Sequence, residues 1–462
     1  MCGIVGYVGA QQAAPILLEG LQKLEYRGYD SAGIAVLDGS TIELAKACGE
    51  TKNLLAKTHD GSDLQGYIGL GHTRWATHGA PTEANAHPHV SNDGKFAIVQ
   101  NGIIENFMEL REMLQAKGFR FHSETDTEVI VHLLDMYYTG DGNLKDTVLK
   151  TLGRLEGSYA IGILCADCPE QMFLARNGCP LIIGVGAGEN FFASDVTALV
   201  SHTKNVVYLD DGGLAEVRAD SYTVFDCTGK PVQKPVSRVA WDIEAAEKGG
   251  YEHFMLKEIM EQPRAIKSTL DPRVKDHRVV FDELKMTDAQ LMGFNKIMIT
   301  ACGSAFYAGQ AGKYALEKLT HIPVDADLAS EFRYRDPIVD EHTLMIIISQ
   351  SGETADTIAA IREAQSKGAY VLSIVNVVGS TIARISDDVI YTWAGPEIAV
   401  ATTKGYTTQV SVLYLLALYL GEKRGCLSRE EAAKLTDDLM ILPQMVQRAI
   451  DLNPQIAQLA ER

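Results

Sequence analysis

The chain has 462 residues, of which 46% are hydrophobic and 22% charged, and its formal net charge is −18. A chain of this length folds as two or three domains, and its negative charge argues against nucleic acid or an anionic membrane as the main partner. No apolar run reaches the roughly 18 residues of a membrane span, and the first residues lack a signal-peptide pattern. We therefore expect a cytoplasmic protein with several globular domains.

The eight cysteines are scattered along the chain. Such scattering suits a reducing compartment better than a disulfide framework. Cys165 and Cys168 have the C-x-x-C spacing, but no second pair follows at the spacing of a zinc site. We expect neither a metal nor a cofactor.

Cys2 directly follows the initiator methionine. Residue 2 is small, which permits removal of Met1, and removal would leave a thiol and a free α-amine on one residue. That amine has a reference pKa of about 7.7–8.0 and can act as a base near neutral pH, so the thiol can become a nucleophile without a histidine. The apolar pair Ile4-Val5 predicts a strand that fixes the terminus. The simpler alternative is an incidental cysteine at a frayed end.

The first 240 residues contain many short strands and few helices. We expect a helix over 17–24, a hairpin of 32–36 and 42–46, and a strand over 66–71. This last strand runs into a polar segment with the sequence H-T-R-W-A-T-H-G, starting at His72. Further strands are expected over 96–99, 159–165, 171–174, 180–185 and 191–193. The pattern predicts a layered α/β sandwich that ends near residue 240.

Asn101 and Gly102 follow a short apolar strand and precede an expected helix over 103–117. An Asn side chain and an adjacent Gly N–H at a strand-to-helix turn can form an oxyanion hole. The alternative is an ordinary Asn-Gly turn. The segment 123–128 then begins another helix, in which either Asp126 or Glu128 is placed to favour the helix dipole. That structural role is compatible with Asp126 also binding a ligand ammonium.

Several stretches of the first half occur in a distinctive order: M-C-G-I at Met1, R-G-Y-D-S at Arg27, H-T-R-W-A-T-H-G at His72, Q-N-G at Gln100 and S-E-T-D-T at Ser123. Together they resemble glutamine amidotransferases with an N-terminal nucleophile. The resemblance implies a four-layer αββα fold, with Cys2 as the nucleophile, its α-amine as the base, and Asn101 with the Gly102 N–H as the oxyanion hole. It also implies a set of residues that hold glutamine or gate ammonia: Arg74, Thr77, His78 and Asp126 bind glutamine, and Trp75 gates ammonia.

After residue 282 the strands alternate with helices, which is typical of a parallel, doubly wound sheet. Strands are expected over 297–300, 324–328, 344–348, 371–375 and 389–391, and helices over 305–319, from 354 to about 367, and over 403–420. Hydroxyl residues join strand to helix at Ser304 and over 349–354, and Thr402 precedes the last helix. Such junctions bind phosphate through hydroxyls and free N–H groups. The alternative is simple N-capping.

These junctions lie in the runs S-E-F-R-Y-R-D at Ser330, S-Q-S-G-E-T-A-D-T at Ser349 and A-T-T-K-G-Y-T-T-Q at Ala401, which resemble a sugar isomerase (SIS) domain. Nearly the whole chain resembles the isomerising glutamine–fructose-6-phosphate aminotransferases, which make glucosamine 6-phosphate and glutamate in the first step of hexosamine synthesis. The resemblance implies glutamine and fructose 6-phosphate as ligands and a homodimer formed through SIS domains. It also implies six sugar-phosphate-binding residues: Ser304, Ser349, Gln350, Ser351, Thr354 and Thr402.

We expect a glutaminase domain over 2–240, a linker over 241–285, an SIS domain over 286–425 and a helical tail over 426–462. Family members carry two SIS domains, and we find one here. The acid/base residues of the isomerase and its sugar-handling lysine belong to the second SIS domain. We therefore expect a fragment that releases ammonia from glutamine without forming glucosamine 6-phosphate.

Two other interpretations remain open at this point. One is a truncated form with glutaminase activity and only sugar-phosphate binding, and the other is a regulatory protein that senses a sugar phosphate. A sensor would keep residues 349–354 but would not need Cys2, Arg74 and Asn101. A phosphoribosyl amidotransferase or an asparagine synthetase would fit the first half, but their partner domains do not match the serine loops of the second.

Overall fold

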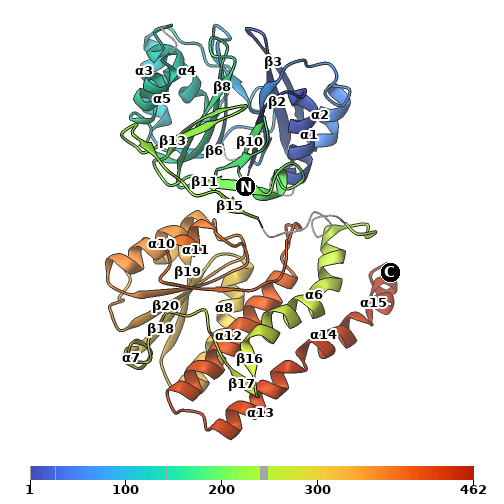
Figure 1. Ribbon diagram of the computed structural model, residues 1–462, viewed down its shortest axis with the longest axis vertical. Coiled ribbons are helices and arrows are strands. Elements are labelled where there is room, and N and C mark those ends of the chain that lie inside the picture. Colours follow the sequence, from blue (N-terminus) through green and yellow to red (C-terminus); the bar gives the residue numbers. More distant parts are fainter. Residues whose placement is uncertain (1, 26–27, 77, 141–142, 240–247, 462) are drawn as a thin grey trace. The chain divides into compact units, whose positions relative to one another are not determined.

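The computed structural model describes residues 2–25, 28–76, 78–140, 143–239 and 248–461. The chain divides into two compact units, residues 1–243 and 244–462 (Figure 1). None of the helices in the described part of the chain has both the length and the apolar character that a bilayer span requires.

In its described residues, the first unit contains two sheets and five α-helices. Its strands are β1 (Gly3–Val8), β2 (Ser31–Asp38), β3 (Thr41–Cys48), β4 (Ile68–Arg74), β5 (His89–Val90), β6 (Phe96–Ile104), β7 (Gly157–Cys165), β8 (Gln171–Asn177), β9 (Ile182–Val185), β10 (Asn190–Ala193), β11 (Asn205–Tyr208), β12 (Leu214–Arg218), β13 (Tyr222–Phe225), β14 (Pro231–Val232) and β15 (Ser237–Arg238). Its helices are α1 (Ala13–Leu24), α2 (Thr51–Lys57), α3 (Phe107–Ala116), α4 (Glu128–Tyr137), α5 (Leu144–Leu152) and the short 3-10 helix η2 (Val196–Ala198).

The two sheets stack face to face, and each carries helices on its outer face (Figure 1). One sheet has the order β15-β11-β9-β10-β1-β4-β2-β3 and the other β14-β13-β12-β8-β7-β6-β5. Strand β6 illustrates why its sequence is continuously apolar. Ala97 and Val99 pack in the core between the sheets, whereas Phe96 and Ile98 pack against α3–α5, because successive side chains point to opposite faces. The expected αββα architecture is confirmed.

One local expectation in this unit is wrong. Asn101 and Gly102 do not form a strand-to-helix turn, because β6 continues through both residues to Ile104 and pairs with β7 throughout. Gly102 has a φ of 109°, and a Cβ there would lie 2.1 Å from the carbonyl oxygen of Ser158. Only glycine fits this position, so the glycine reports a close approach of two strands rather than a turn.

The second unit is built around one parallel sheet. Its strands are β16 (Val274–Lys275), β17 (Arg278–Val279), β18 (Lys296–Ala301), β19 (Val324–Leu328), β20 (Thr343–Ser349), β21 (Tyr370–Val375) and β22 (Asp388–Tyr391). Its helices are α6 (Phe254–Leu270), η4 (Asp271–Arg273), α7 (Asp288–Gly293), α8 (Ser304–Thr320), α9 (Ala329–Phe332), α10 (Ala355–Ser366), α11 (Thr381–Ile385), α12 (Lys404–Lys423), α13 (Arg429–Met440), α14 (Leu442–Ile450) and α15 (Asn453–Ala460).

The sheet order β19-β18-β20-β21-β22 has every neighbour parallel. Ile299 and Ile346 pack into the core on one face, while Met298 and Ile347 pack into the core on the other. The doubly wound expectation is therefore confirmed. In chain order the strands run 2-1-3-4-5, so the chain reverses direction across the sheet between β18 and β20. Ligands of such sheets bind at the carboxyl ends of the strands beside this switch point.

Candidate active site

Cys2 lies immediately before β1, which pairs with β4 so that Gly3 faces Thr73. This register brings Cys2 beside the end of β4, where the Trp75 N–H donates a hydrogen bond to the Cys2 Sγ at 3.2 Å. Burial raises the pKa of the Cys2 thiol. A thiol with a raised pKa is protonated at neutral pH, so its attack on an amide requires a base.

The segment around Asp30 holds the end of β4 in place. The Asp30 carboxylate accepts a hydrogen bond from the Ala76 N–H, and the Asp30 N–H donates to the Arg74 carbonyl oxygen at 3.2 Å. A Cβ on Gly28 would lie 2.7 Å from the Arg74 carbonyl carbon. In the sequence, Gly28 and Asp30 belong to the R-G-Y-D-S motif, but no role was predicted for either residue. The glycine and the acid on either side of one tyrosine were the available signal.

The Asn101 side chain lies against the backbone of Cys2. Its Nδ2 donates to the Cys2 carbonyl oxygen at 3.1 Å. Cys2 precedes a strand of one sheet and Asn101 belongs to a strand of the other. The two residues therefore meet because the sheets stack, which no local sequence pattern predicts.

Arg74 is buried, with 3% of its surface exposed. Its guanidinium donates to the carbonyl oxygens of Ala80 at 3.2 Å and Gly79 at 3.1 Å, and to that of His78. Among the described residues, no carboxylate forms an ion pair with it. A buried cation without a counter-ion is costly, and a guanidinium fork matches the geometry of a carboxylate ligand.

Asp126 is a buried carboxylate just before α4. Its Oδ2 accepts a hydrogen bond from the Ile104 N–H at 2.8 Å, and its Oδ1 lies 3.8 Å from Nδ1 of His78. Burial raises the pKa of Asp126. A bound ammonium would stabilise the ionised form and lower that pKa again.

Trp75 directly follows β4 and lies beside Cys2. Trp75 is 45% exposed, and its ring makes an edge-to-face contact with Tyr29 at 5.3 Å between centroids. Thr77, predicted to line the glutamine pocket, lies outside the described residues.

In the second unit, two of the predicted loops meet at the switch point. Ser304 is the first residue of α8, directly after Gly303, and Ser349 is the last residue of β20. The Ser349 Oγ accepts a hydrogen bond from the Gly352 N–H at 3.0 Å and lies 3.5 Å from the Thr354 Oγ1. Because β18 and β20 are adjacent and parallel, both loops lie at the same edge of the sheet.

The remaining predicted residues of this unit have other partners. The Ser351 Oγ accepts from the Glu353 N–H at 3.2 Å, and the Gln350 carbonyl oxygen accepts from the Asn376 N–H at 3.3 Å.

Thr402 lies near the start of α12, whose first amides are already occupied. Oε1 of Glu397 accepts from the N–H groups of Thr403 at 2.9 Å and Gly405 at 3.0 Å. In contrast, no side chain in the described part of the chain caps the start of α8 or α10. The first two loops, rather than the third, offer their helix N-termini to an anion.

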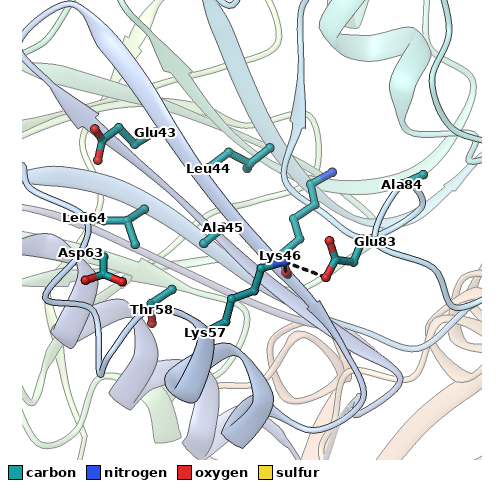
Figure 2. Close-up of a pocket in the computed structure, with 10 residues that line it drawn as sticks. All are labelled: Glu43, Leu44, Ala45, Lys46, Lys57, Thr58, Asp63, Leu64, Glu83 and Ala84. Atoms are coloured by element: carbon teal, nitrogen blue, oxygen red, sulfur yellow. Dashed lines mark hydrogen bonds and ion pairs between the residues drawn. The ribbon is translucent and has the colours of Figure 1, made fainter.

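A separate open pocket of about 630 Å³ lies on β3, beside α2 (Figure 2). The Lys57 Nζ donates to Glu83 and to the Lys46 carbonyl oxygen at 2.7 Å each, and burial lowers the pKa of Lys46 to about 8. None of the predicted site residues in the described part of the chain lines this pocket, so it is distinct from the Cys2 site.

Each of the two units matches the model of a known domain family. A glutamine amidotransferase domain model matches residues 49–240, and an SIS domain model matches residues 290–419. The glutamine–fructose-6-phosphate aminotransferase (isomerizing) of Caldanaerobacter subterraneus subsp. tengcongensis is 53% identical over 99% of this chain and 75% of its own length. The Clostridium tetani protein of the same name is 50% identical over 100% of this chain and 76% of its own length.

Among solved structures, the C-terminal domain of glucosamine-fructose-6-phosphate aminotransferase from Francisella tularensis is 37% identical, with a TM-score of 0.45. The match covers 46% of this chain and 61% of that one. The chain spans about three quarters of the length of the two curated relatives.

Proposed function

The chain belongs to the family of isomerizing glutamine–fructose-6-phosphate aminotransferases, and from this premise we propose how its residues divide the reaction. The family transfers the amide nitrogen of glutamine to fructose 6-phosphate, forming glucosamine 6-phosphate and glutamate. In our proposal the first unit releases the nitrogen as ammonia and the second binds the sugar phosphate.

Cys2 is the nucleophile once Met1 is removed. Its α-amine takes the thiol proton, directly or through a water, while Sγ attacks the amide carbon of glutamine. The α-ammonium returns the proton to the leaving nitrogen, ammonia departs, and a γ-glutamyl thioester remains on Cys2. Water then hydrolyses the thioester to glutamate. The observation that carries this proposal is the placement of Cys2 between the Trp75 N–H and the Asn101 amide.

Asn101 and the Gly102 N–H stabilise the oxyanion that forms when Sγ attacks. The hydrogen bond from the Asn101 Nδ2 to the Cys2 carbonyl oxygen supports this role, because it places the donor beside the nucleophile. The close approach of Gly102 to Ser158 fixes the backbone at this point.

Arg74 and Asp126 bind the two charges of the amino acid. The guanidinium of Arg74 holds the α-carboxylate and the carboxylate of Asp126 holds the α-ammonium, with Thr77 and His78 lining the pocket. Trp75 gates the passage of ammonia. The absence of an ion-pair partner for Arg74 within the described chain supports the first assignment, and the burial of Asp126 supports the second.

In the second unit, the phosphate of fructose 6-phosphate binds at the N-termini of α8 and α10. Four residues supply the hydroxyls there: Ser304, Ser349, Ser351 and Thr354. Gln350 and Thr402 add further contacts. The support is the convergence of both loops at the switch point of the sheet.

We also propose that the chain acts in the cytoplasm as a homodimer formed through SIS domains, independently of nucleic acid and membranes. The net charge of −18 and the eight free cysteines support the compartment and the partner class. Light scattering tests the assembly, since a dimer has twice the 50.3 kDa mass of one chain.

The direct test of the nucleophile compares two cysteines. Cys2→Ala should abolish glutamate release from glutamine. Cys179→Ser is the matched control, since Cys179 is another partly buried thiol of the same unit whose pKa burial raises to about 11. It should retain most of the activity. Normal turnover by Cys2→Ala would end the assignment.

A further inference from the structure

Three buried histidines cluster beside Gln100 and Asn101. His72 belongs to β4, His87 precedes β5, and His89 begins it. The His72 and His87 rings stack at 4.1 Å between centroids, and His89 meets His87 edge-on at 4.8 Å. Burial lowers the pKa of His72 to about 3 and the pKa values of the other two well below 6.5. All three rings are therefore neutral at physiological pH.

The hydrogen bonds of His72 fix its tautomer. Its Nε2 lies 3.1 Å from the Gln100 carbonyl oxygen and 3.0 Å from the Asn101 Oδ1. A carbonyl oxygen can only accept, so the Nε2 of His72 carries the hydrogen. The same hydrogen faces Asn101, which must therefore present its oxygen to His72.

The other end of the Asn101 amide independently requires the same orientation of the side chain. Its second partner is the carbonyl oxygen of Cys2, at 3.1 Å, which also can only accept. The NH₂ group of Asn101 thus faces Cys2, and its oxygen faces His72. Two acceptors on opposite sides, at Cys2 and Gln100, agree on one orientation of the amide and one tautomer of the imidazole.

We propose that His72 is a positioning residue for the oxyanion hole: its Nε2–H holds the Asn101 amide so that Nδ2 faces the nucleophile. This inference rests on the proposed oxyanion role of Asn101. The terminal torsion of Asn is broad, so without this donor the amide can rotate and turn its oxygen toward the developing negative charge. A rotated amide would destabilise the oxyanion instead of stabilising it.

His72 does not serve as the base for Cys2. Its Nε2–H is committed to two acceptors, and its Nδ1 is buried without a hydrogen-bond partner in the described part of the chain. A base with so low a pKa takes up little of a thiol proton at neutral pH. The contribution of His72 is a fixed donor with constant protonation.

The neighbouring histidine, His87, supports the same strand. The Gln100 N–H donates to the Nδ1 of His87 at 3.3 Å. The Nε2 of His87 therefore carries the hydrogen and faces the Thr127 Oγ1 at 3.4 Å, and that hydroxyl donates to the Gln100 Oε1 at 2.7 Å. Gln100, the residue before Asn101, is thus held through its backbone and its side chain.

The segment that carries the proposed ammonium ligand also supports the histidines. Thr125 and Thr127 flank Asp126, and the Thr125 Oγ1 lies 3.1 Å from the Nε2 of His89. The two threonines contact the histidine stack, whereas Asp126 accepts from the Ile104 N–H. One short segment therefore serves both the substrate-binding charge and the oxyanion donor.

A matched pair of substitutions tests the inference. His72→Gln replaces the ring with an amide that can donate to Asn101, and His72→Met has similar length but no donor. We expect His72→Met to lower the glutaminase kcat about tenfold or more, with the KM for glutamine changed less than about twofold. His72→Gln should recover most of the loss. Equal losses in both variants, or a loss confined to KM, would overturn the inference.

A double-mutant cycle separates this inference from the proposed function. If His72 acts through Asn101, then His72→Met should cause no further loss in an Asn101→Ala background. Additive losses would overturn the inference and leave the oxyanion role intact. An unchanged kcat in Asn101→Ala alone would overturn the oxyanion role and the inference together.

The unsubstituted protein offers a second measurement, which does not depend on whether the variants fold. Nitrogen-15 NMR of labelled imidazoles should show His72 as the neutral Nε2–H tautomer, unchanged from about pH 5 to 9. A proton on Nδ1, or a titration of His72 in this range, would overturn the inference.

Discussion

The two candidate sites hold their functional groups in different ways. In the first unit, buried side chains form hydrogen bonds across two sheets: the His72 ring bonds to the Asn101 side chain, which donates to the Cys2 carbonyl oxygen. In the second, the hydroxyls bond within their own loop, as Ser349 does to Gly352. The first site is a connected network, whereas the second presents separate donors at helix ends.

This difference has a consequence for how each site responds to substitution. Groups in one network share partners, so their effects are coupled and act on the chemical step. Donors at helix N-termini act mainly through the charge of the ligand and fall off within the first turn. We therefore expect large, coupled changes in kcat in the first unit and modest changes in affinity in the second.

Among the residues around Cys2, Asn101 should give the largest effect. Asn101→Ala removes a donor to the developing oxyanion and should lower the glutaminase kcat about 10²–10³-fold, while the KM for glutamine changes little. Steady-state glutamate release measures both constants. The control is Asn106→Ala. Asn106 lies two residues beyond β6, and its side chain donates to the Arg154 carbonyl oxygen. A variant with weak binding but normal kcat would make Asn101 a binding residue instead.

Arg74 should affect binding rather than chemistry. Arg74→Gln can keep hydrogen bonds to the nearby carbonyl oxygens but removes the charge, so the KM for glutamine should rise about 10²-fold. Arg154→Gln changes an exposed guanidinium of the same unit and should leave the KM near normal. If both variants bind glutamine equally well, the α-carboxylate has another partner.

Substitution in the second unit should have a smaller effect. Ser349→Ala removes a hydroxyl at the switch point and should weaken fructose 6-phosphate binding about tenfold, measured by calorimetry. The control is Ser366→Ala at the far end of α10, where the hydroxyl donates to the Glu363 carbonyl oxygen. Equal affinities in the two variants would place the phosphate elsewhere.

The smallest expected effect is a change in the KM for glutamine with pH. Burial raises the pKa of Asp126 above its usual 3.8, and only the ionised carboxylate binds an ammonium. The KM for glutamine should therefore rise a few-fold as the pH falls through that raised pKa. The folded state binds this proton more tightly than the unfolded state, so ionised Asp126 opposes folding above its folded pKa. Asp126→Asn should have a high KM without this acid limb, and persistence of the limb would assign it to another group.

The sequence was most informative where structure depends on local pattern. The hairpin of β2 and β3 follows from apolar residues on either side of Asp38-Gly39, and β18 and β20 follow from short apolar runs before hydroxyl residues. Period and turn chemistry are properties of neighbouring residues, so they can be read from the chain itself.

The sequence was least informative where contacts join distant segments. Gly102 was expected in a turn, because Asn-Gly is an ordinary turn sequence. Its close approach to Ser158 depends instead on the register of β6 with β7, which the sequence does not reveal. The bond from His72 to Asn101 joins strands of different sheets. Composition and periodicity contain no information on which strands stack, so neither this bond nor the Asp30 contact with Ala76 was predicted.

The central claim is that Cys2 carries the γ-glutamyl group during turnover. Acid quenching of the protein during turnover of isotopically labelled glutamine, followed by peptide mass spectrometry, locates that group. We predict the label as a thioester on an N-terminal peptide that begins at Cys2, without Met1. A label on another residue, or none in a protein that is still turning over, would contradict the account.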